Sequence, residues 1–544
     1  MTTQRHRPEV TPETVHIPLS PQVRQRNIER LQAEAFDILV IGGGINGAAV
    51  ARDAAMRGLR VALIEKGDFA SGTSSKSSKL IHGGIRYLQH GNLRLVRVAC
   101  RERDLLRRQL APHLVEPLAF LFPVYRGDPV NIVTLGLGMW LYDLLAVFRN
   151  IRVHRMLSAK ELRTVEPGLR QQELRGAALY YDCFTDDARL TIETVLAAHE
   201  EGAVVANYME LKEFTKQDGC IVGAVLESRF GEARIVVRAR RVVNVTGPWV
   251  DRVRHLDDPD ATPCLRLTKG VHIIVPRMRL PIVRAIVMHS PRDRRVLFAI
   301  PWAEHTLIGT TDTDFEGTQD DVKADDQDID YLLEAANWFF PRAKLGVADV
   351  VSSYAGLRPL VADPDAADPS AVSREEEIFE APSGLISLGG GKLTTHRLIA
   401  TEIVDLVARR LGVRRRRRGR RSSLTASKPL PGGLSKDPEA FVKDLVAKDG
   451  CGLTAAQIEH LARRYGTRTD EVLALLVAHA ELREPVVPGM PDILAEAVHA
   501  ARAEMALQPD DVLLRRTQVG LKEPARASQV LELMREIISR FTQN

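Results

Sequence analysis

The chain has 544 residues, several times the length of a usual domain, which excludes a single small binding module and predicts two or three domains. Charged residues make up 27% and apolar residues 45%, a balance that excludes a mostly disordered chain or a many-span membrane protein. The net charge is +5, but seven arginines fall in the segment 414–421. The rest of the chain is near neutral, so global charge predicts no nucleic-acid partner.

Cysteine usage and the N-terminal residues bear on the compartment. The five cysteines are scattered and never spaced as Cys-x-x-Cys, so the sequence predicts neither a disulfide framework nor a metal site. Residues 1–22 carry prolines and charges where a signal peptide would need a continuous apolar stretch. We therefore expect a cytoplasmic protein.

The first elements predict a parallel sheet. Residues 1–35 are polar and are expected to form an N-terminal extension, with a short helix over 23–35. The run 36–41 is apolar, β-branched and followed by glycines, as a buried parallel strand is. An alanine-rich helix over 47–58 and a second strand over 60–65 follow. This β-α-β order opens a doubly wound sheet.

The later segments predict two further regions. Strand-like segments between turns predict a β-rich middle, and a strand at 387–391 precedes a helical pattern over 395–411. After a linker rich in arginine and serine, amphipathic patterns predict helices. The strand-like segments are 234–245, 272–275, 295–300 and 305–309, and the helical ones are 455–465, 469–480, 492–504 and 528–541.

Together these elements predict an α/β + α fold in three parts. Residues 1–35 form the extension. Residues 36–426 form a Rossmann-like dinucleotide-binding domain with an inserted β-rich substrate domain. Residues 427–544 form an all-α C-terminal domain.

A glycine fingerprint lies between the first strand and helix. Gly42, Gly44 and Gly47 are spaced as Gly-x-Gly-x-x-Gly, which permits a tight turn, close approach to a pyrophosphate and close helix–strand packing. Glu65 ends the next strand, where a carboxylate accepts hydrogen bonds from ribose hydroxyls. The alternative is a glycine-rich turn in an ordinary α/β protein, but the strand–helix–strand context favours the fingerprint. The fingerprint itself does not separate FAD from NAD.

Two downstream features favour FAD. Small and hydroxyl residues over 67–75 directly follow the ribose carboxylate and suit close passage past a bulky ring system. A second glycine turn at 389–391 precedes a helix whose N-terminal amides can stabilise negative charge on a reduced flavin. A nicotinamide enzyme needs neither feature.

Several long motifs, in order along the chain, closely resemble those of the FAD-dependent glycerol-3-phosphate dehydrogenases. The resemblance extends from residue 36 to about residue 517, with a histidine at 396 where a tyrosine is common and only a loose match over 373–375. The motifs are Ile41–Gly47, Thr73–Leu88, Asn244–Trp249, Lys269–Pro276, Gly309–Asp312, Tyr354–Pro359, Gly390–Thr395 and Asp511–Thr517.

The resemblance implies an activity and partners. These are oxidation of sn-glycerol 3-phosphate to dihydroxyacetone phosphate, hydride transfer from C2 to flavin N5, and delivery of electrons to a membrane quinone. An oxidase that uses oxygen would share the site, and the sequence does not separate the two. A flavin-bearing nucleic-acid-binding protein is a third reading of the arginine run, but no stacking aromatics are interleaved there. The sequence leaves open a homo-oligomer and the mode of flavin attachment.

The resemblance also assigns cofactor contacts. They lie on both glycine turns, on the segment after Glu65 and on one turn in the middle of the chain. The expected FAD-binding residues are Gly42, Gly44, Asn46, Gly47, Glu65, Thr73, Ser74, Ser75, Ser78, Lys79, His82, Gly83, Gly247, Gly390, Gly391, Lys392, Leu393 and Thr394.

The substrate phosphate carries nearly two negative charges and needs fixed cations. The resemblance assigns this role to Arg86, Arg358, Arg374 and Lys392, and it places Tyr87 at the pocket. Each basic residue could instead lie on a solvated face. Glycines or a proline beside Arg86, Arg358 and Lys392 favour the functional interpretation.

Hydride removal from C2 also requires the C2 hydroxyl proton to leave, and histidine has the most suitable ordinary pKa. We predict His272 as the base, with His82 and His396 as alternatives. A structural hydrogen-bonding role is the competing interpretation. Asp186 and Asp187 precede a helical pattern and are interpreted as helix caps rather than a cation site.

Residues 130–148 are nearly uncharged, contain Trp140 and Tyr142, and have arginines on both sides. Such a segment suits reversible attachment to the inner face of the cell membrane. A buried core helix is the alternative, and the segment barely reaches the roughly 20 residues that a bilayer crossing needs. The arginine run could bind anionic lipid or form a solvated linker.

Overall fold

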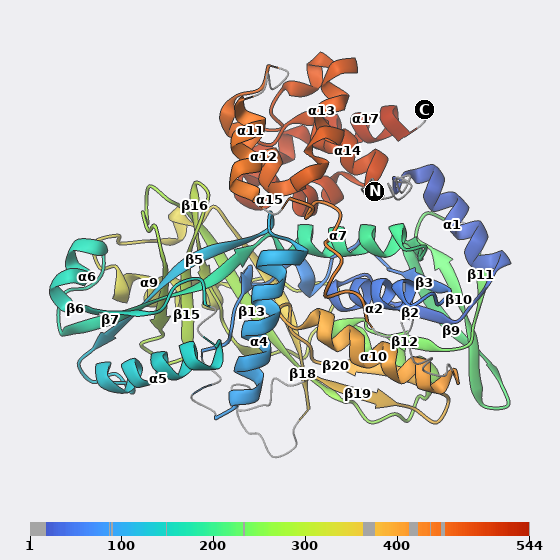
Figure 1. Cartoon of the computed structure of the whole chain (residues 1–544), viewed down its shortest axis with the longest axis horizontal. Helices are drawn as coiled ribbons and strands as arrows, with labels where there is room; N and C mark the ends of the chain where they lie inside the picture. The colour runs from blue at the N-terminus through green and yellow to red at the C-terminus, as the bar shows by residue number, and fades with distance from the viewer. Residues whose placement is uncertain are drawn as a thin grey trace, which may run out of the picture.

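The computed structural model describes residues 18–542 except 86–87, 89–90, 148–149, 232–233, 363–375, 413–422, 436 and 448–451. Figure 1 shows an elongated body of sheets and helices, with a compact group of helices packed on one side of it. The body holds three sheets, and the helical group is formed by the C-terminal residues.

The dinucleotide-binding part is a six-stranded sheet ordered β19-β20-β12-β2-β3-β8. Five strands are parallel and β19 is an antiparallel edge. Helices α2, α7 and α10 pack over one face, where apolar side chains of the strands and helices form a common core. Bounds are β2 Ile38–Ile41, α2 Ile45–Met56, β3 Val61–Ile64, α7 Asp187–Glu200, β8 Val204–Ala206, β12 Val242–Asn244, β19 Glu377–Glu380, β20 Leu385–Gly389 and α10 His396–Arg410.

The opening strand, helix and second strand are therefore where the sequence predicts them. The opposite face of the sheet shares a core with a four-stranded sheet ordered β1-β11-β10-β9. Bounds of its strands are β1 Ala35–Phe36, β9 Met209–Gln217, β10 Cys220–Ser228 and β11 Ile235–Ala239. The helix α8, Val250–Asp257, contacts β9 and β20.

Residues 18–35, which we expected as an extension, are packed into this body. The helix α1, Pro21–Ala33, is capped by Ser20 and contacts β8 and β11. Besides Ile28 and Leu31 it buries polar Asn27, whose amide donates to the carbonyl of Val205 at 2.9 Å. The short helix predicted over 23–35 is therefore present, and part of its polar composition is buried.

The β-rich part is a ten-stranded sheet whose middle joins strands far apart in the chain. Strand β13 lies between β16 and β18 and is antiparallel to both. Bounds are β4 Leu80–Ile81, β5 Val115–Tyr125, β6 Arg155–Ser158, β7 Leu174–Thr185, β13 Leu265–Pro276, β14 Ala285–His289, β15 Val296–Trp302, β16 His305–Gly309, β17 Thr313–Asp314 and β18 Ser352–Val361. The helices beside it are α4 Leu93–Leu105, α5 Ile132–Leu145, α6 Ala159–Val165 and α9 Asp326–Phe339.

The C-terminal residues form a helical domain with its own hydrophobic core. A π-helical turn over Asp511–Arg516 lies within it. The helices are α11 Pro438–Ala447, α12 Ala455–Tyr465, α13 Thr469–Ala478, α14 Leu494–Ala503, α15 Val519–Lys522, α16 Pro524–Ala527 and α17 Leu531–Thr542. Four of them match the predicted amphipathic segments closely.

Candidate active site

The glycine turn and Glu65 form one end of the site. Gly42 has a φ of +112°, a conformation that side chains rarely adopt, and Gly44 is the N-cap of α2. The Glu65 carboxylate accepts the main-chain N–H groups of Gly43 at 2.7 Å and Gly67 at 2.8 Å. Burial raises the pKa of Glu65, and these two hydrogen bonds oppose the rise. The carboxylate thus fixes the turn as well as facing the cavity beside it.

This cavity, which we call the cofactor cavity, has a volume of about 220 Å³. Gly390 and Gly391 also line it, with φ of +77° and +102°, and at these glycines main chain reaches the wall. The Ser74 hydroxyl accepts the N–H of Ile45 at 3.0 Å and lies where a Cβ on Gly44 would point. Other predicted residues in the lining are Asn46, Thr73, Gly247, Lys392 and Leu393.

The cofactor cavity adjoins a larger one of about 600 Å³, which we call the catalytic cavity. Thr73, Ser77 and Leu393 line both. The Glu65 carboxylate and the N-terminus of α2 line one cavity, and a wider chamber adjoins it, which suits the ribose, the pyrophosphate and the flavin ring of FAD. The residues present fit FAD, with Gly44 and Gly390 making room for close approach of the pyrophosphate and ring.

Two predicted catalytic residues meet in the catalytic cavity. Strand register pairs His272 of β13 with Gly309 of β16 and with Tyr354 of β18. A Cβ on Gly309 would collide with the imidazole of His272, and one on Gly270 would lie 2.7 Å from the guanidinium of Arg358. The two glycines therefore make space for the imidazole and the guanidinium on one face of the sheet.

The imidazole of His272 is buried and held neutral. Its Nε2 is 2.8 Å from Ser78 Oγ, and its ring stacks on Tyr354 at 4.8 Å between centroids. Burial, and then the charges of Arg358 and Lys79, lower the pKa of His272 from 6.5 to about 3. At neutral pH the ring therefore carries no charge and can accept a proton.

Arg358 supplies a cation beside this base. Its guanidinium donates to Asp312 at 2.9 Å and to Thr310 Oγ1 at 3.0 Å while lining the cavity. Lys76 and Arg295 also line the cavity, and our sequence analysis assigned neither to the site. Lys76 lies within the motif Thr73–Leu88, so the family resemblance could have identified it. Arg295 lies in no such motif and was predicted only to begin a strand.

The remaining predicted residues are distributed differently. Lys392 lines the cofactor cavity, 3.7 Å from Glu376, and does not share a cavity with Arg358. Lys79 is fully buried against Asp187 at 2.6 Å and lines neither cavity. Gly47, Ser75, Gly83 and Thr394 are likewise outside both linings, although Gly47 is packed against Gly42 and Thr394 accepts the N–H of His82.

The structure also shows where the two alternative bases and the two predicted helix caps lie. His82 lines the catalytic cavity, whereas His396 is buried with its Nδ1 2.7 Å from the carbonyl of Leu393. Burial lowers the pKa of His396 to about 4. Asp186 caps α7 as predicted, but Asp187 instead binds Lys79. Arg86, Tyr87, Arg374 and the arginine run 414–421 lie outside the described residues.

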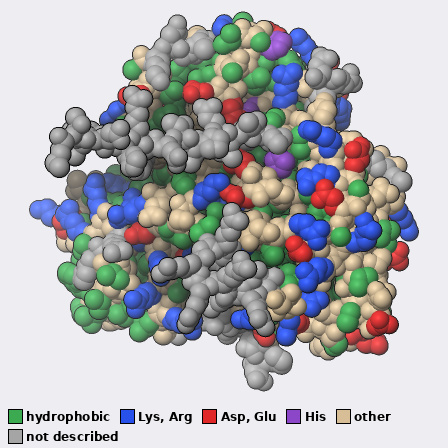
Figure 2. Space-filling model, turned by 45° about the vertical axis from the view of Figure 1, so that its right-hand side comes forward, with side chains coloured by type: hydrophobic (Ala, Val, Ile, Leu, Met, Phe, Trp, Pro, Cys, Tyr) green, Lys and Arg blue, Asp and Glu red, His purple; other side chains and the backbone are tan. Residues whose placement is uncertain are grey.

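The far end of the catalytic cavity is apolar and reaches the surface helix α5. Leu137 and Leu141 of α5 line the cavity and are also exposed to solvent. Val133, Trp140 and Leu144 of the same helix are 57–69% exposed. Figure 2 shows apolar side chains gathered at the lower left of the molecule, the side on which α5 lies in Figure 1. The helix α5 thus buries one face in the hydrophobic core and leaves an apolar face exposed.

A parallel sheet with a phosphate-binding turn, joined to a chamber that holds a neutral histidine and an arginine, defines a dinucleotide-dependent oxidoreductase. Residues 37–406 match the family model of FAD-dependent oxidoreductases. Residues 423–543 match the C-terminal domain of alpha-glycerophosphate oxidase.

Similar proteins agree with this. The aerobic glycerol-3-phosphate dehydrogenase of Staphylococcus saprophyticus is 36% identical over 507 residues, 92% of this chain and 89% of that protein. The crystal structure of the glycerol-3-phosphate dehydrogenase from Bacillus halodurans complexed with FAD has a TM-score of 0.80 and 33% identity, covering 96% of this chain and 94% of that one. The L-alpha-glycerophosphate oxidase from Mycoplasma pneumoniae, at 20% identity and a TM-score of 0.55, shares the fold. The chain belongs to the family of FAD-dependent oxidoreductases, and its cofactor is FAD.

Proposed function

We propose that the protein oxidises sn-glycerol 3-phosphate to dihydroxyacetone phosphate and passes the electrons to a membrane quinone. The observation that carries the proposal is the pairing of neutral His272 with Arg358 in a chamber continuous with the cofactor cavity. The names of the relatives support the substrate, since both the staphylococcal protein and the Bacillus halodurans protein are glycerol-3-phosphate dehydrogenases.

The chemistry assigns a role to each side chain. Bound FAD supplies the acceptor for the hydride that leaves C2. Arg358 binds the phosphate through charge-assisted hydrogen bonds, and Lys76 and Arg295 add positive charge to the same cavity. By resemblance Arg86 and Arg374 belong to this set, and Lys392 contributes from the cofactor side.

His272 takes the C2 hydroxyl proton at Nε2, the nitrogen that already bonds the cavity-lining hydroxyl of Ser78. The charge of Arg358 is one cause of the low pKa of His272. A phosphate dianion at Arg358 offsets that charge, so substrate binding raises the pKa of His272 and makes the imidazole a stronger base. Proton removal is thereby favoured when substrate is present.

The acceptor is proposed from the apolar end of the catalytic cavity. Glycerol 3-phosphate is small and polar and gains no polar contact from a wall of phenylalanine, leucine and valine side chains. A quinone ring is apolar and can pack against that wall. That wall includes α5, whose outer face is apolar and suits insertion at the surface of the inner leaflet. Among the described residues no helix is both long and apolar enough to span a bilayer.

An oxidase is the second candidate, because residues 423–543 match a domain named for alpha-glycerophosphate oxidase. Both candidates predict reduction of the flavin by glycerol 3-phosphate and differ in what reoxidises it.

The test is anaerobic mixing of the purified yellow protein with glycerol 3-phosphate, followed by oxygen or a water-soluble quinone analogue. We expect the flavin absorbance to bleach with glycerol 3-phosphate but not with glycerol. We expect the quinone analogue to restore it much faster than oxygen does. Equal reduction by glycerol would contradict the phosphate site, and rapid recovery with oxygen would favour the oxidase.

A further inference from the structure

The loop that follows Glu65 makes two kinds of contact. Its residues Glu65, Lys66, Gly72, Thr73 and Ser74 line the cofactor cavity. Within the same loop, the main-chain N–H of Ala70 donates to the carbonyl of Gly43 at 3.1 Å, so the loop also closes on the glycine turn. The position of this loop therefore sets the shape of the cofactor cavity.

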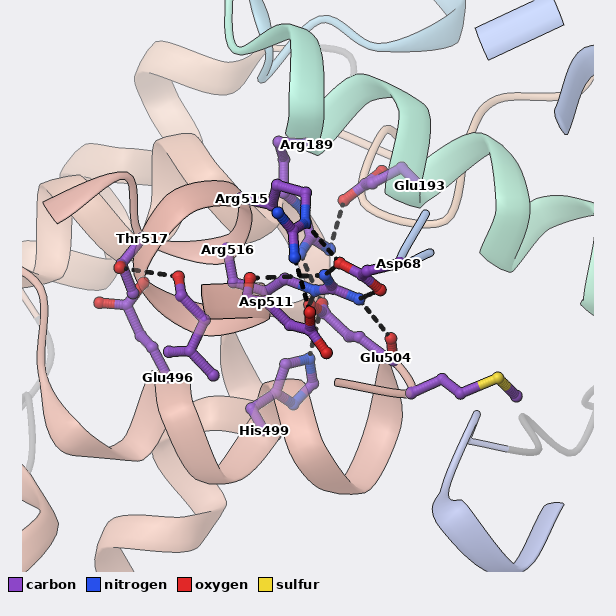
Figure 3. Close-up of polar contacts among 12 residues, drawn as sticks. Asp68, Arg189, Glu193, Glu496, His499, Glu504, Asp511, Arg515, Arg516 and Thr517 are labelled. Carbon is purple, nitrogen blue, oxygen red and sulfur yellow. Dashed lines mark hydrogen bonds and ion pairs between the residues drawn. The ribbon is translucent and has the colours of Figure 1, made fainter. Parts of the chain in front are cut away.

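Asp68, in the middle of the loop, lines neither cavity and is 1% exposed. Its partners belong to the C-terminal domain. The guanidinium of Arg515 donates to Oδ2 at 2.6 Å, and that of Arg516 donates to both carboxylate oxygens, with Oδ1 at 3.1 Å. Figure 3 shows both arginines converging on this carboxylate. Burial alone would raise the pKa of Asp68, but the charges of Arg516 and Arg515 outweigh it and hold the pKa below its ordinary value.

Further hydrogen bonds join the C-terminal domain to the cofactor cavity around this contact. Asp511, one turn before Arg515, accepts the hydroxyl of Tyr208 at 2.6 Å, and Tyr208 directly precedes Met209 in the wall of the cofactor cavity. Asn207 bridges the two domains, donating to Asp68 at 3.1 Å and to the carbonyl of Met505 at 2.8 Å. Segment 504–518 thus contacts two segments that line the cofactor cavity, the 65–75 loop through Asp68 and the Tyr208–Met209 segment through Asp511.

Asp68 and Arg516 are both buried, so an Asp68 that lost its arginines would be left as an unpaired charge away from water. Loss of the pair would therefore favour displacement of the loop toward solvent. Displacement would move Gly67 away from Glu65 and Ser74 away from the N-terminus of α2, and both contacts shape the FAD site.

We propose that Arg515 and Arg516 of the C-terminal domain are positioning residues for the cofactor, which hold the 65–75 loop in its FAD-binding position through Asp68. The C-terminal domain is thereby a latch on the cofactor site. Because coupling between two events is reciprocal, FAD binding also tightens the docking of segment 504–518.

The test measures FAD affinity in full-length apoprotein. Arg516→Met and Asp68→Asn are each expected to weaken FAD at least tenfold. The double variant is expected to be no more than twofold weaker than the weaker single one, since both changes break one contact. Arg516→Lys, which keeps the charge, is expected to recover part of the affinity. FAD added to wild-type apoprotein is expected to slow hydrogen exchange of the 504–518 amides.

The control is Leu476→Ala, which removes a fully buried side chain from α13, at the end of the domain away from the sheets in Figure 1. It should lower the unfolding temperature while leaving FAD affinity within twofold of the wild type. The proposal is overturned if Arg516→Met and Asp68→Asn bind FAD within threefold of the wild type, or if Leu476→Ala weakens FAD as much as they do. If Arg516→Met does not fold, Arg515→Gln decides by the same threefold limit.

Discussion

The cofactor cavity and the catalytic cavity adjoin, yet they are built differently. In the cofactor cavity, glycines on two turns bring main chain to parts of the wall, and the Glu65 carboxylate binds N–H groups of the glycine turn and of the loop that follows it. The catalytic cavity is shaped by side chains from strands that are distant in sequence. Ser78 and His272, in hydrogen-bond contact there, are 194 residues apart. Both sites exclude an added side chain at particular glycines, Gly42 in the first and Gly270 in the second, so the two differ mainly in how far apart in sequence their contacting residues lie.

The largest expected effect lies in the cofactor cavity. Gly44→Val places a branched side chain against Ser74 Oγ, where the pyrophosphate must approach, so we expect protein purified without flavin. The absorbance ratio of flavin to protein measures this, and circular dichroism checks the fold. Full flavin occupancy in this variant would show that the cavity is not the cofactor site.

The next effect lies in the catalytic cavity. We expect His272→Ala to retain FAD and substrate affinity and to lower the rate of flavin reduction in a single turnover by ~10²–10⁴, because the C2 hydroxyl loses its proton acceptor. Stopped-flow absorbance measures the rate. Tyr354→Phe keeps the ring that stacks on His272 and is the matched control, with a much smaller loss. A near wild-type rate in His272→Ala would transfer the role to His82 or to water.

The two cavities are distinguished by one basic residue from each, Arg358 in the catalytic cavity and Lys392 in the cofactor cavity. Arg358→Met is expected to weaken glycerol 3-phosphate by about 1.5–3 kcal/mol, roughly ten- to hundredfold, because a phosphate loses a charge-assisted partner. Lys392→Met, in the cofactor cavity, is expected to weaken FAD more than substrate. Titrations of each variant with FAD and with substrate give the four affinities. Identical patterns for the two variants would mean that one pocket holds both side chains when ligands are bound.

The outer face of α5 gives a smaller effect. Replacing Trp140 and Leu144 together by serine removes two exposed apolar side chains, and we expect binding to anionic vesicles to weaken about tenfold. Val477→Ser, which replaces a still more exposed apolar residue on α13, is the control and should leave vesicle binding unchanged. Flotation of all variants with vesicles measures this, and a wild-type protein left wholly in the soluble fraction would favour the oxidase.

The smallest change is expected in the pH profile. Neutral His272 is the active form, and its folded pKa is about 3, so kcat/KM should show no fall from this group as the pH drops through 6.5. Arg358→Met removes a cation that depresses this pKa, so the acidic limb should move upward toward neutral pH. A wild-type limb centred near 6.5 would mean that His272 is solvated in the working enzyme.

The same histidine links pH to stability. The pKa of His272 in the folded protein is below its unfolded value of 6.5. Its contribution to the free energy of unfolding is therefore complete above pH 6.5 and is lost as the pH falls from there toward about 3. His272→Gln should therefore flatten the decline in unfolding free energy over that interval.

Local sequence determined the cofactor end. The spacing of Gly42, Gly44 and Gly47 between a strand and a helix predicts the turn because each glycine acts within a few residues of the next. Glu65 follows from the same unit. The C-terminal helices were also predictable, since their apolar periodicity is a property of each segment alone.

Tertiary structure decided the rest, because burial depends on partners that no local pattern contains. Arg24 and Asn27 contribute to the polar composition from which an extension was predicted, yet both side chains are buried. The ammonium of Lys79, a predicted FAD-binding residue, is paired with Asp187 in the interior. The resemblance assigned both Lys392 and Arg358 to the substrate phosphate, and the pairing of β13 with β18 places Arg358 on the same sheet as His272. The contact of Asp68 with Arg516 joins residues 448 positions apart. The role of a carboxylate in the middle of a loop could not be predicted, because its partner belongs to a second domain that packs against the loop.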